Sequence, residues 1–267
     1  MTLLLLAGLA LLAEPALGHG GLANYTVGDT WYRGCVHSHH DPHNTIPNPH
    51  NQTTDTQLTH HSYDPFTPAT DQLNQPWMIQ RQWSSIDPLF TPLSPYLACN
   101  NPGTPPPSYI PIAAGANLTA VYWYWLHPYG PMTVWLAYCG DNNTDCADVD
   151  VSRVGWFKIW EAGLLDGNLV EGMWWQKQFQ RWDGEPGLWN ARVPKGLRRG
   201  LYMVRHEILS IHVGGKPQFY PECAHLNVTG GGEVVVPEEW LLRFPGGYKE
   251  DGEFHFLGVG RWVGRWG

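Results

Sequence analysis

The chain has few charged side chains, and beyond residue 13 it has no apolar run long enough to span a bilayer. Asp, Glu, Lys and Arg make up only 15% of its 267 residues, and the net charge is −8 at pH 7. This balance argues against binding to nucleic acid or to an anionic membrane surface, and favours a neutral partner. The sequence also lacks an internal repeat and any long segment with helical periodicity, so a helical architecture is not expected.

Glycine, proline and tryptophan are abundant instead, with 30, 23 and 15 residues respectively. This composition favours short strands joined by many turns, as in a sandwich or a barrel. Residues 63–101 are rich in proline and polar side chains and predict long ordered loops. Alternation predicts strands over residues 22–32 (with a turn at Gly28-Asp29), 118–125, 132–139, 155–160, 184–194, 201–213 and 218–229.

The N-terminus has the layout of a secretory signal peptide. Leu3–Ala13 is a nearly unbroken apolar run, and Ala16 and Gly18 supply small residues at the −3 and −1 positions of a cut after Gly18. The residues before the run carry no positive side chain, which departs from the usual pattern. We expect residues 1–18 to be removed, and a secreted protein that begins at His19 and is not attached to a membrane. The amine and imidazole of a leading His can chelate a metal through two nitrogens.

The five cysteines of an exported chain are expected to form disulfides. Cys139 and Cys146 flank a short polar loop that a disulfide would close. Cys99 and Cys223 would then form a long-range bridge and leave Cys35 unpaired. Sequons that fit surface glycosylation, each also a common chance match, lie at Asn24, Asn51, Asn117, Asn142 and Asn227.

Four side chains have the placement of a metal site. His127 follows a predicted strand, where an imidazole can project from a rigid sheet. Gln218 and Tyr220 are two residues apart on one predicted strand, so both emerge on the same face. His212, on the preceding strand, could turn toward them across the intervening turn. Taken alone, His127 is more often an ordinary polar loop residue, and Tyr220 a half-buried strand tyrosine.

A series of motifs runs along the chain from His19 to about Tyr248. They are His19-Gly20, Tyr32-Arg33-Gly34, Leu73-Asn74-Gln75-Pro76-Trp77, Leu97-Ala98-Cys99-Asn100, Gly130-Pro131-Met132-Thr133-Val134-Trp135-Leu136-Ala137, Lys158-Ile159, Arg205-His206-Glu207-Ile208, Gln218-Phe219-Tyr220-Pro221-Glu222-Cys223 and Val228-Thr229-Gly230. In this order they resemble the family 9 lytic polysaccharide monooxygenases, formerly classed as family 61 glycoside hydrolases.

The resemblance implies a copper site of the kind called a histidine brace. His19 would bind through its amine and one ring nitrogen, His127 through a further ring nitrogen, and Tyr220 at the axial position. Nitrogen donors in one plane suit tetragonal Cu(II), and an α-amine with a pKa near ~8 loses its proton readily at neutral pH. By the same resemblance, Gln218 and His212 would have a catalytic role, guiding protons beside the copper. Arg205-His206-Glu207 is interpreted as structural.

The same family implies an all-β fold, an immunoglobulin-like or fibronectin-like antiparallel β-sandwich with long loops. It also implies the disulfides Cys99–Cys223 and Cys139–Cys146, in agreement with the spacing. The expected activity is oxidative cleavage of β-1,4-glucan, such as cellulose, at C1 or C4, with an external electron donor and O2 or H2O2. A monomer is expected. Tyr25 is a candidate for stacking on a flat glucan chain.

Two segments depart from the family, so the monooxygenase domain is taken as residues 19–251 with an insert. Residues 35–62 are extra and dense in histidine, and residues 252–267 replace the family's continuation. Codons for both sets of junction residues permit splice sites, which predicts translated introns; a second metal site at His37, His39, His40 and His43 is the alternative for the insert. His127 departs slightly, because Pro128-Tyr129 stands where the family often has one residue before Gly-Pro.

Other functions compete with this interpretation. A glycoside hydrolase would need two positioned carboxylates, and no Asp or Glu sits in a recognisable hydrolase motif. A non-catalytic copper- or glycan-binding sandwich is the main alternative, although a copper carrier has little use for Gln218 beside an open coordination position. A structural protein would use the many aromatic residues only as core.

Overall fold

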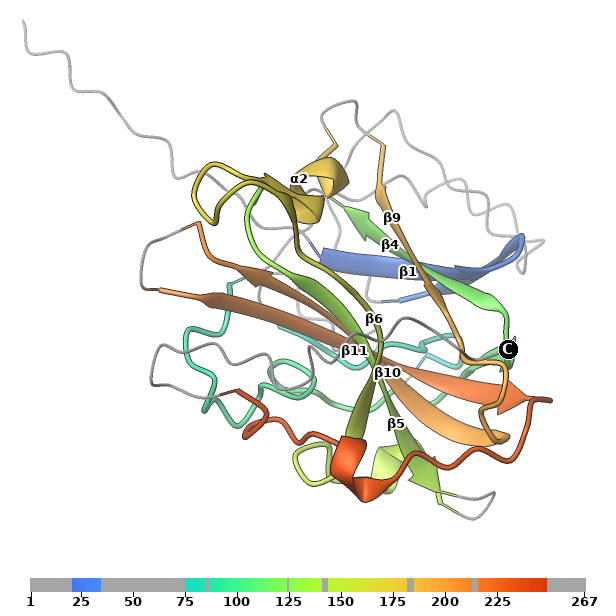
Figure 1. Ribbon diagram of the computed structural model, residues 1–267. Helices are drawn as coiled ribbons and strands as arrows, with labels where there is room; N and C mark the ends of the chain where they lie inside the picture. Colours follow the sequence, from blue (N-terminus) through green and yellow to red (C-terminus); the bar gives the residue numbers. More distant parts are fainter. Residues whose placement is uncertain are drawn as a thin grey trace, which may run out of the picture.

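The computed structural model describes residues 21–34, 75–84, 87–123, 125–140, 144–181, 185–212 and 216–248. They form two β-sheets that lie one over the other as the layers of a sandwich (Figure 1). The all-β sandwich expected from the sequence is therefore confirmed. Within these ranges no helix has the length and apolar character needed to cross a membrane. The expectations for residues 1–20, 35–62 and 252–267, and for Asn142, lie outside the described residues.

The smaller sheet contains the N-terminal strand. Its β1–β2 hairpin turns at Gly28, whose φ is 56°, as the sequence predicted. All pairs in this sheet are antiparallel. From one edge to the other its strands are β2 (Thr30–Arg33), β1 (Gly21–Val27), β4 (Asn117–Trp123) and β9 (Gly187–Arg192).

The larger sheet carries the long strands β10 and β11, which pair in register over their whole length. Its edge strand β3 runs parallel to β11, an exception to the expected antiparallel arrangement. β3 has only four residues and follows a proline-rich loop, so it is too short for an alternating pattern to be recognised in the sequence. From one edge to the other the strands are β3 (Ile110–Ala113), β11 (Gln218–Thr229), β10 (Gly200–Ser210), β5 (Met132–Gly140) and β6 (Trp156–Ala162).

The remaining elements are short, and most of them come directly after the edge strand β6 in the sequence. The hairpin of β7 and β8 leads directly into α2, and neither was predicted because two to five residues carry no period. Figure 1 shows α2 near the end of β4. The bounds are β7 (Leu164–Asp166), β8 (Met173–Trp174), α2 (Trp175–Phe179) and the 3-10 turns η1 (Cys146–Asp148) and η2 (Glu238–Trp240).

The main core lies between the two sheets and is built by alternate residues of each strand. On β9, Trp189 and Ala191 are buried, whereas the alternating residues Leu188, Asn190 and Arg192 are exposed. Tyr25 of β1 also points into this core, with 0% of its surface exposed, and its hydroxyl lies 3.1 Å from His206 Nδ1. The prediction that Tyr25 stacks on a glucan chain is therefore wrong, because the period-2 pattern of β1 turns this side chain inward.

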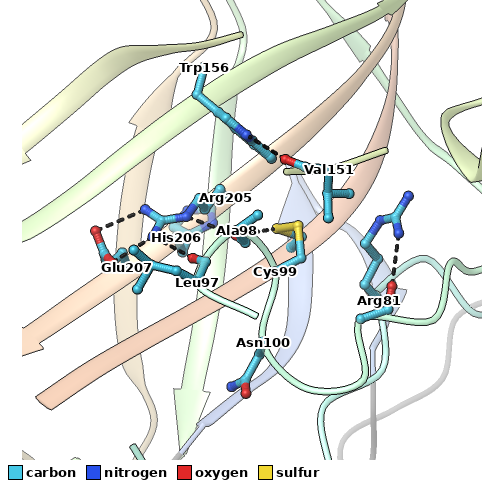
Figure 2. Close-up of a disulfide and its surroundings, with 12 residues drawn as sticks. Arg81, Leu97, Ala98, Cys99, Asn100, Val151, Trp156, Arg205, His206 and Glu207 are labelled. Carbon is cyan, nitrogen blue, oxygen red and sulfur yellow. Dashed lines mark hydrogen bonds and ion pairs between the residues drawn. A yellow bond between two sulfur atoms is a disulfide. The ribbon is translucent and has the colours of Figure 1, made fainter. Parts of the chain in front are cut away.

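The outer face of the larger sheet is also buried, because ordered loops cover it. Loop residues 97–99 and Phe244 pack against the residues of β5, β10 and β11 that face away from the smaller sheet. On this face Arg205 donates to the carbonyls of Leu97 and Ala98 and pairs with Glu207 at 2.6 Å (Figure 2). The guanidinium thereby joins the loop layer to β10. The structural interpretation of this motif is confirmed, as are the ordered loops in the described part of 63–101.

Both expected disulfides are formed. Cys99–Cys223 joins the covering loop to β11 across a sequence separation of 124 residues. Cys139–Cys146 closes a separation of 7 residues at the end of β5. The first disulfide joins two layers of the molecule, whereas the second connects two residues that are close in sequence.

Candidate metal centre

The candidate site lies where β10 ends and β11 begins. Ser210 is paired with Gln218, and Ile208 with Tyr220, so the strand register fixes where these residues lie. Gln218 and Tyr220 are buried, at 9% and 3% exposure, and their spacing of two places both on one face. This shared face was predicted from the sequence.

His127 reaches the same place from the loop between β4 and β5. Its Nε2 lies 3.3 Å from the hydroxyl of Tyr220, and its ring is 8% exposed. The two residues are 93 apart in sequence, and only the packing of the two sheets brings them together. The extra residue in Pro128-Tyr129 therefore does not prevent the imidazole from reaching Tyr220.

The proton of the Tyr220 hydroxyl has a definite acceptor. The hydroxyl donates to Oε1 of Gln218 at 2.8 Å, which leaves its lone pairs available toward His127. Burial, with a smaller contribution from the carboxylate of Asp87, raises the pKa of Tyr220 above its usual value, so the phenol stays protonated. Gln218 thus orients a neutral phenol oxygen toward the imidazole nitrogen.

His212 completes the cluster from just beyond β10. Its ring stacks on that of His127, with centroids 4.1 Å apart and planes inclined by 13°. Its Nδ1 is hydrogen-bonded to the hydroxyl of Ser210 at 2.6 Å. Partial burial lowers the pKa of His212, which favours the neutral ring. The structure therefore brings together four of the five predicted site residues; the fifth, His19, lies outside the described residues.

Trp125 supports this cluster and was not identified from the sequence. Its ring meets the rings of His127 and Tyr220 edge-on, with centroid distances of 5.2 and 4.9 Å. Its Nε1 donates to the carbonyl of His127 at 3.0 Å, which fixes the loop backbone as well. The spacing of two between Trp125 and His127 was the available signal, but it lies in an irregular loop.

The loop that carries His127 is pressed against β10 at Gly130. A Cβ at Gly130 would lie 1.9 Å from the carbonyl oxygen of Leu209, and its φ of 133° also favours glycine. Two backbone hydrogen bonds of 3.0 Å, from Leu209 to Pro131 and from Ile211 to Tyr129, flank this contact. The loop and β10 therefore form one rigid unit.

Two glutamines, one within α2 and one directly after it, also hydrogen-bond to this unit of loop and β10. The Gln180 amide donates to the carbonyl of Leu126, the residue before His127. The Gln176 amide donates to the carbonyl of Leu209 at 3.4 Å. Gln176 is fully buried, and sequence reasoning missed both because an amide in a five-residue helix carries no pattern of its own.

The donors present are suited to copper, although they are incomplete by themselves. Among the described residues, no three His, Cys, Asp or Glu side chains gather in a way that could hold a metal ion. His127 and Tyr220 supply one nitrogen and one neutral oxygen that face each other, and a cation can accept both lone pairs. Imidazole nitrogen suits copper, which also binds most tightly among the divalent first-row metals. Further nitrogen donors must come from residues outside the described ranges.

Known proteins match most of this chain. The profile of Auxiliary Activity family 9 (formerly GH61) matches residues 19–257. AA9 family lytic polysaccharide monooxygenase B of Heterobasidion irregulare is 35% identical over 248 residues, which cover 92% of this chain and 86% of that protein. AA9 family lytic polysaccharide monooxygenase D of Thermothelomyces thermophilus is 32% identical over 254 residues, 90% of this chain and 82% of that protein.

Solved structures agree with the sequence comparison. The crystal structure of HiLPMO9B is 33% identical, with a TM-score of 0.67, and the match covers 86% of this chain and 87% of that one. A cellulose-active polysaccharide monooxygenase from M. thermophila is 29% identical, with a TM-score of 0.68, covering 87% and 88%. The motifs, the sandwich and these matches agree: the chain belongs to Auxiliary Activity family 9, the lytic polysaccharide monooxygenases.

Proposed function

We propose that this protein is a secreted, copper-dependent monooxygenase that cleaves β-1,4-glucan, with cellulose as the first polymer to test and oxidation at C1, C4 or both. The observation that carries the proposal is the contact of His127 with the Tyr220–Gln218 pair in a member of this family. The relative from M. thermophila is itself described as cellulose-active. We also propose a monomer that takes electrons from a small reductant or a redox protein.

In this proposal three residues hold the metal. His19, as the first residue of the mature chain, would provide its amine and ring nitrogen, His127 would provide Nε2, and Tyr220 would provide its hydroxyl oxygen. With electrons from the external donor, copper held there would activate O2 or H2O2, and this co-substrate would provide the oxidising equivalents for attack on a glycosidic C–H bond. The described residues leave Tyr220 neutral and aimed at His127, which fits a weak oxygen donor to copper.

Gln218 and His212 would act beside the metal. Gln218 Oε1 accepts the phenol proton, and its amide nitrogen remains as a donor to a polar group in the site. His212 stacks on His127 and hydrogen-bonds Ser210, so its ring has a fixed orientation in which it can hold or pass a proton. Because such neighbours orient ligands and set their basicity, we propose that both residues act in catalysis.

The proposal requires that proteolysis expose His19. The signal-peptide layout of residues 1–18 supports this, and the family match also begins at residue 19. We further propose that residues 35–62 and 252–267 are translated introns, which transcript reads across both junctions test directly. Spliced reads are the expected result, whereas uniformly unspliced reads would contradict it. Glycosylation of Asn117 and Asn227, which are exposed, is a further proposal for the secreted chain.

The decisive experiment uses secreted wild-type protein. N-terminal sequencing should find His19 first, titration should show one tightly bound Cu(II) per chain, and mass spectrometry should find oxidised oligosaccharides released from phosphoric-acid-swollen cellulose. The variant H225F is a matched control, because His225 is buried elsewhere in the sandwich and its removal should leave copper binding intact. A different first residue, or no tight copper binding, would refute the proposal. Tight binding without oxidised products would favour the non-catalytic copper-binding alternative.

A further inference from the structure

We propose that Glu222 is a positioning residue for the metal centre: with Gln80 it holds the backbone of Leu22, the fixed point from which the chain leads back to the proposed ligand His19. We call Glu222 and Gln80 the Leu22 clamp. The inference rests on the proposed function, in which His19 is a copper ligand. It concerns residues that neither touch the metal nor belong to the proposed ligand set.

The clamp binds backbone groups that the sheet leaves available. The register between β1 and β4 shifts between Leu22 and Asn24, which interrupts the regular ladder there. The N–H of Leu22 donates to Oε2 of Glu222 at 2.7 Å, and the amide of Gln80 donates to the Leu22 carbonyl at 3.1 Å. Gln80 also donates to the same carboxyl oxygen of Glu222 at 3.4 Å. Both backbone groups of one residue are thus held by two buried side chains.

Close packing removes the remaining freedom of this segment. A Cβ at Gly21 would lie 2.2 Å from the ring of Trp83, so β1 runs directly over that ring. On the other side, the N–H of Gly34 donates to the carbonyl of Ala23 at 2.9 Å. Trp83 is 2% exposed, so the surrounding residues hold its ring in place against β1. The chain direction at Leu22 is therefore set by contacts on several sides.

The clamp also connects this segment to the candidate metal centre. Glu222 and Tyr220 are two residues apart on β11, so their side chains share the inner face of one rigid strand. Leu22 is three residues from His19, a span of at most about 10 Å. A single strand therefore supplies the proposed axial ligand and, through Leu22, the reference point for the proposed terminal ligand.

A carboxyl group at this position has a cost that an apolar residue would avoid. Glu222 is 3% exposed, and burying a carboxyl group costs free energy unless hydrogen bonds satisfy its oxygens. The hydrogen bonds from the Leu22 N–H and the Gln80 amide both go to Oε2 of this carboxyl group. A buried acceptor is expected at this position if the Leu22 N–H must form its hydrogen bond in one fixed direction. A glutamine can supply the same acceptor, which gives a conservative variant.

The test compares E222L, which removes the acceptor, with E222Q, which keeps it. We expect E222L to weaken Cu(II) binding by about 10- to 100-fold, measured by calorimetry, and to change the Cu(II) electron paramagnetic resonance spectrum. E222Q should stay close to the wild type in both. The control V228A removes buried volume from the same face of β11 far along the strand. It should lower thermal stability and leave affinity and spectrum unchanged.

The outcomes separate this inference from the proposed function. Wild-type protein that binds no copper refutes the proposed function, whatever the variants do. Wild-type protein that binds tightly, with E222L equal to it in affinity and spectrum, overturns the positioning role alone, as does V228A producing the same spectral change as E222L. Should E222L not be recovered folded, Q80L takes its place, because it removes the donor to the Leu22 carbonyl. Unchanged affinity and spectrum in Q80L then overturn the inference.

Discussion

The Tyr220 hydroxyl has two neighbours with different roles. Oε1 of Gln218 accepts a hydrogen bond from it at 2.8 Å, and Nε2 of His127 lies 3.3 Å from its oxygen. Because burial keeps the phenol protonated, its oxygen is a neutral and therefore weak metal donor. The imidazole of His127 is the stronger donor. The two residues should thus contribute unequally to copper binding, although both face the same point.

This inequality predicts the effects of two substitutions. H127A removes the proposed nitrogen ligand, and we expect it to weaken Cu(II) binding by more than about 100-fold, beyond the usual effect of a residue that only supports a ligand. Y220F removes only the proposed oxygen ligand and should weaken binding by less than about 10-fold while changing the electron paramagnetic resonance spectrum. Calorimetric titration of both variants checks this. Equal losses of affinity would contradict the assignment of Tyr220 as the weak ligand.

A second prediction concerns His225, a buried residue of β11 away from the metal centre. Neither ring nitrogen has a hydrogen-bond partner among the described residues, and the ring lies 5.0 Å from that of Tyr109. Burial lowers its pKa to about 3, with a smaller effect of Arg81 in the same direction and an opposing one of Asp145. The folded protein therefore binds this proton less readily than the unfolded chain does.

The sign of the pH dependence follows. Below the unfolded pKa of about 6.5, only the unfolded chain takes up the proton, so stability falls toward pH 3 by up to about 1.4 kcal/mol per pH unit. We expect H225F to remove this loss, and to match the wild type near pH 7. Urea unfolding from pH 7 to pH 4 measures it. V228A, which has no titrating group, should stay parallel to the wild type; a parallel curve for H225F would contradict the prediction.

Among the elements, the loop of residues 125–131 decides whether His127 reaches the site. A hydrogen bond within the loop, from Trp125 to the carbonyl of His127, and contacts from Gln180 and the backbone of β10 hold it in place. Its closest approach to β10 is at Gly130. A loop fixed at this many points acts as part of the sheet, so its imidazole has one position and not several.

Replacing Gly130 should therefore be costly. G130A must relieve both a positive φ and a contact of 1.9 Å with the Leu209 carbonyl, and we expect a loss of at least about 2 kcal/mol in unfolding free energy. G28A is the matched control: its φ of 56° is also positive, but nothing lies within 4 Å of the added Cβ. It should cost only about 1–2 kcal/mol. Equal losses by urea unfolding would show that the contact at Gly130 relaxes freely.

The elements also show what the sequence can and cannot predict. β11 was predicted at its observed bounds, because its start and end are marked by turn residues and its period is regular. β3, β7, β8 and α2 were missed because each is too short for a period. The site residues His127, His212, Gln218 and Tyr220 came from their places on or beside predicted strands and from the resemblance to the family. Trp125, Gln176, Gln180 and Glu222 gain their roles only through contacts between distant segments, which one sequence does not display.

For the whole molecule, the loops form a third layer over the larger sheet. Arg205 binds the carbonyls of Leu97 and Ala98, and the Cys99–Cys223 disulfide joins the same loop to β11. Together they keep the outer face of the strand that carries Gln218 and Tyr220 covered (Figure 2). The two disulfides should therefore differ in importance.

The lengths of chain that the two disulfides close predict how much each contributes to the free energy of unfolding. Closing the 124-residue separation of Cys99 and Cys223 restricts the unfolded chain by about 5 kcal/mol, against about 2 kcal/mol for the 7-residue separation of Cys139 and Cys146. We expect C99A/C223A to lose roughly twice the unfolding free energy of C139A/C146A in urea. C99A/C223A should also open the loop layer, so hydrogen exchange of β11 amides should rise in that variant and not in the other. Similar losses in the two variants would mean that residual structure in the unfolded chain already brings Cys99 close to Cys223, and that the loop layer is held by Arg205 and packing alone.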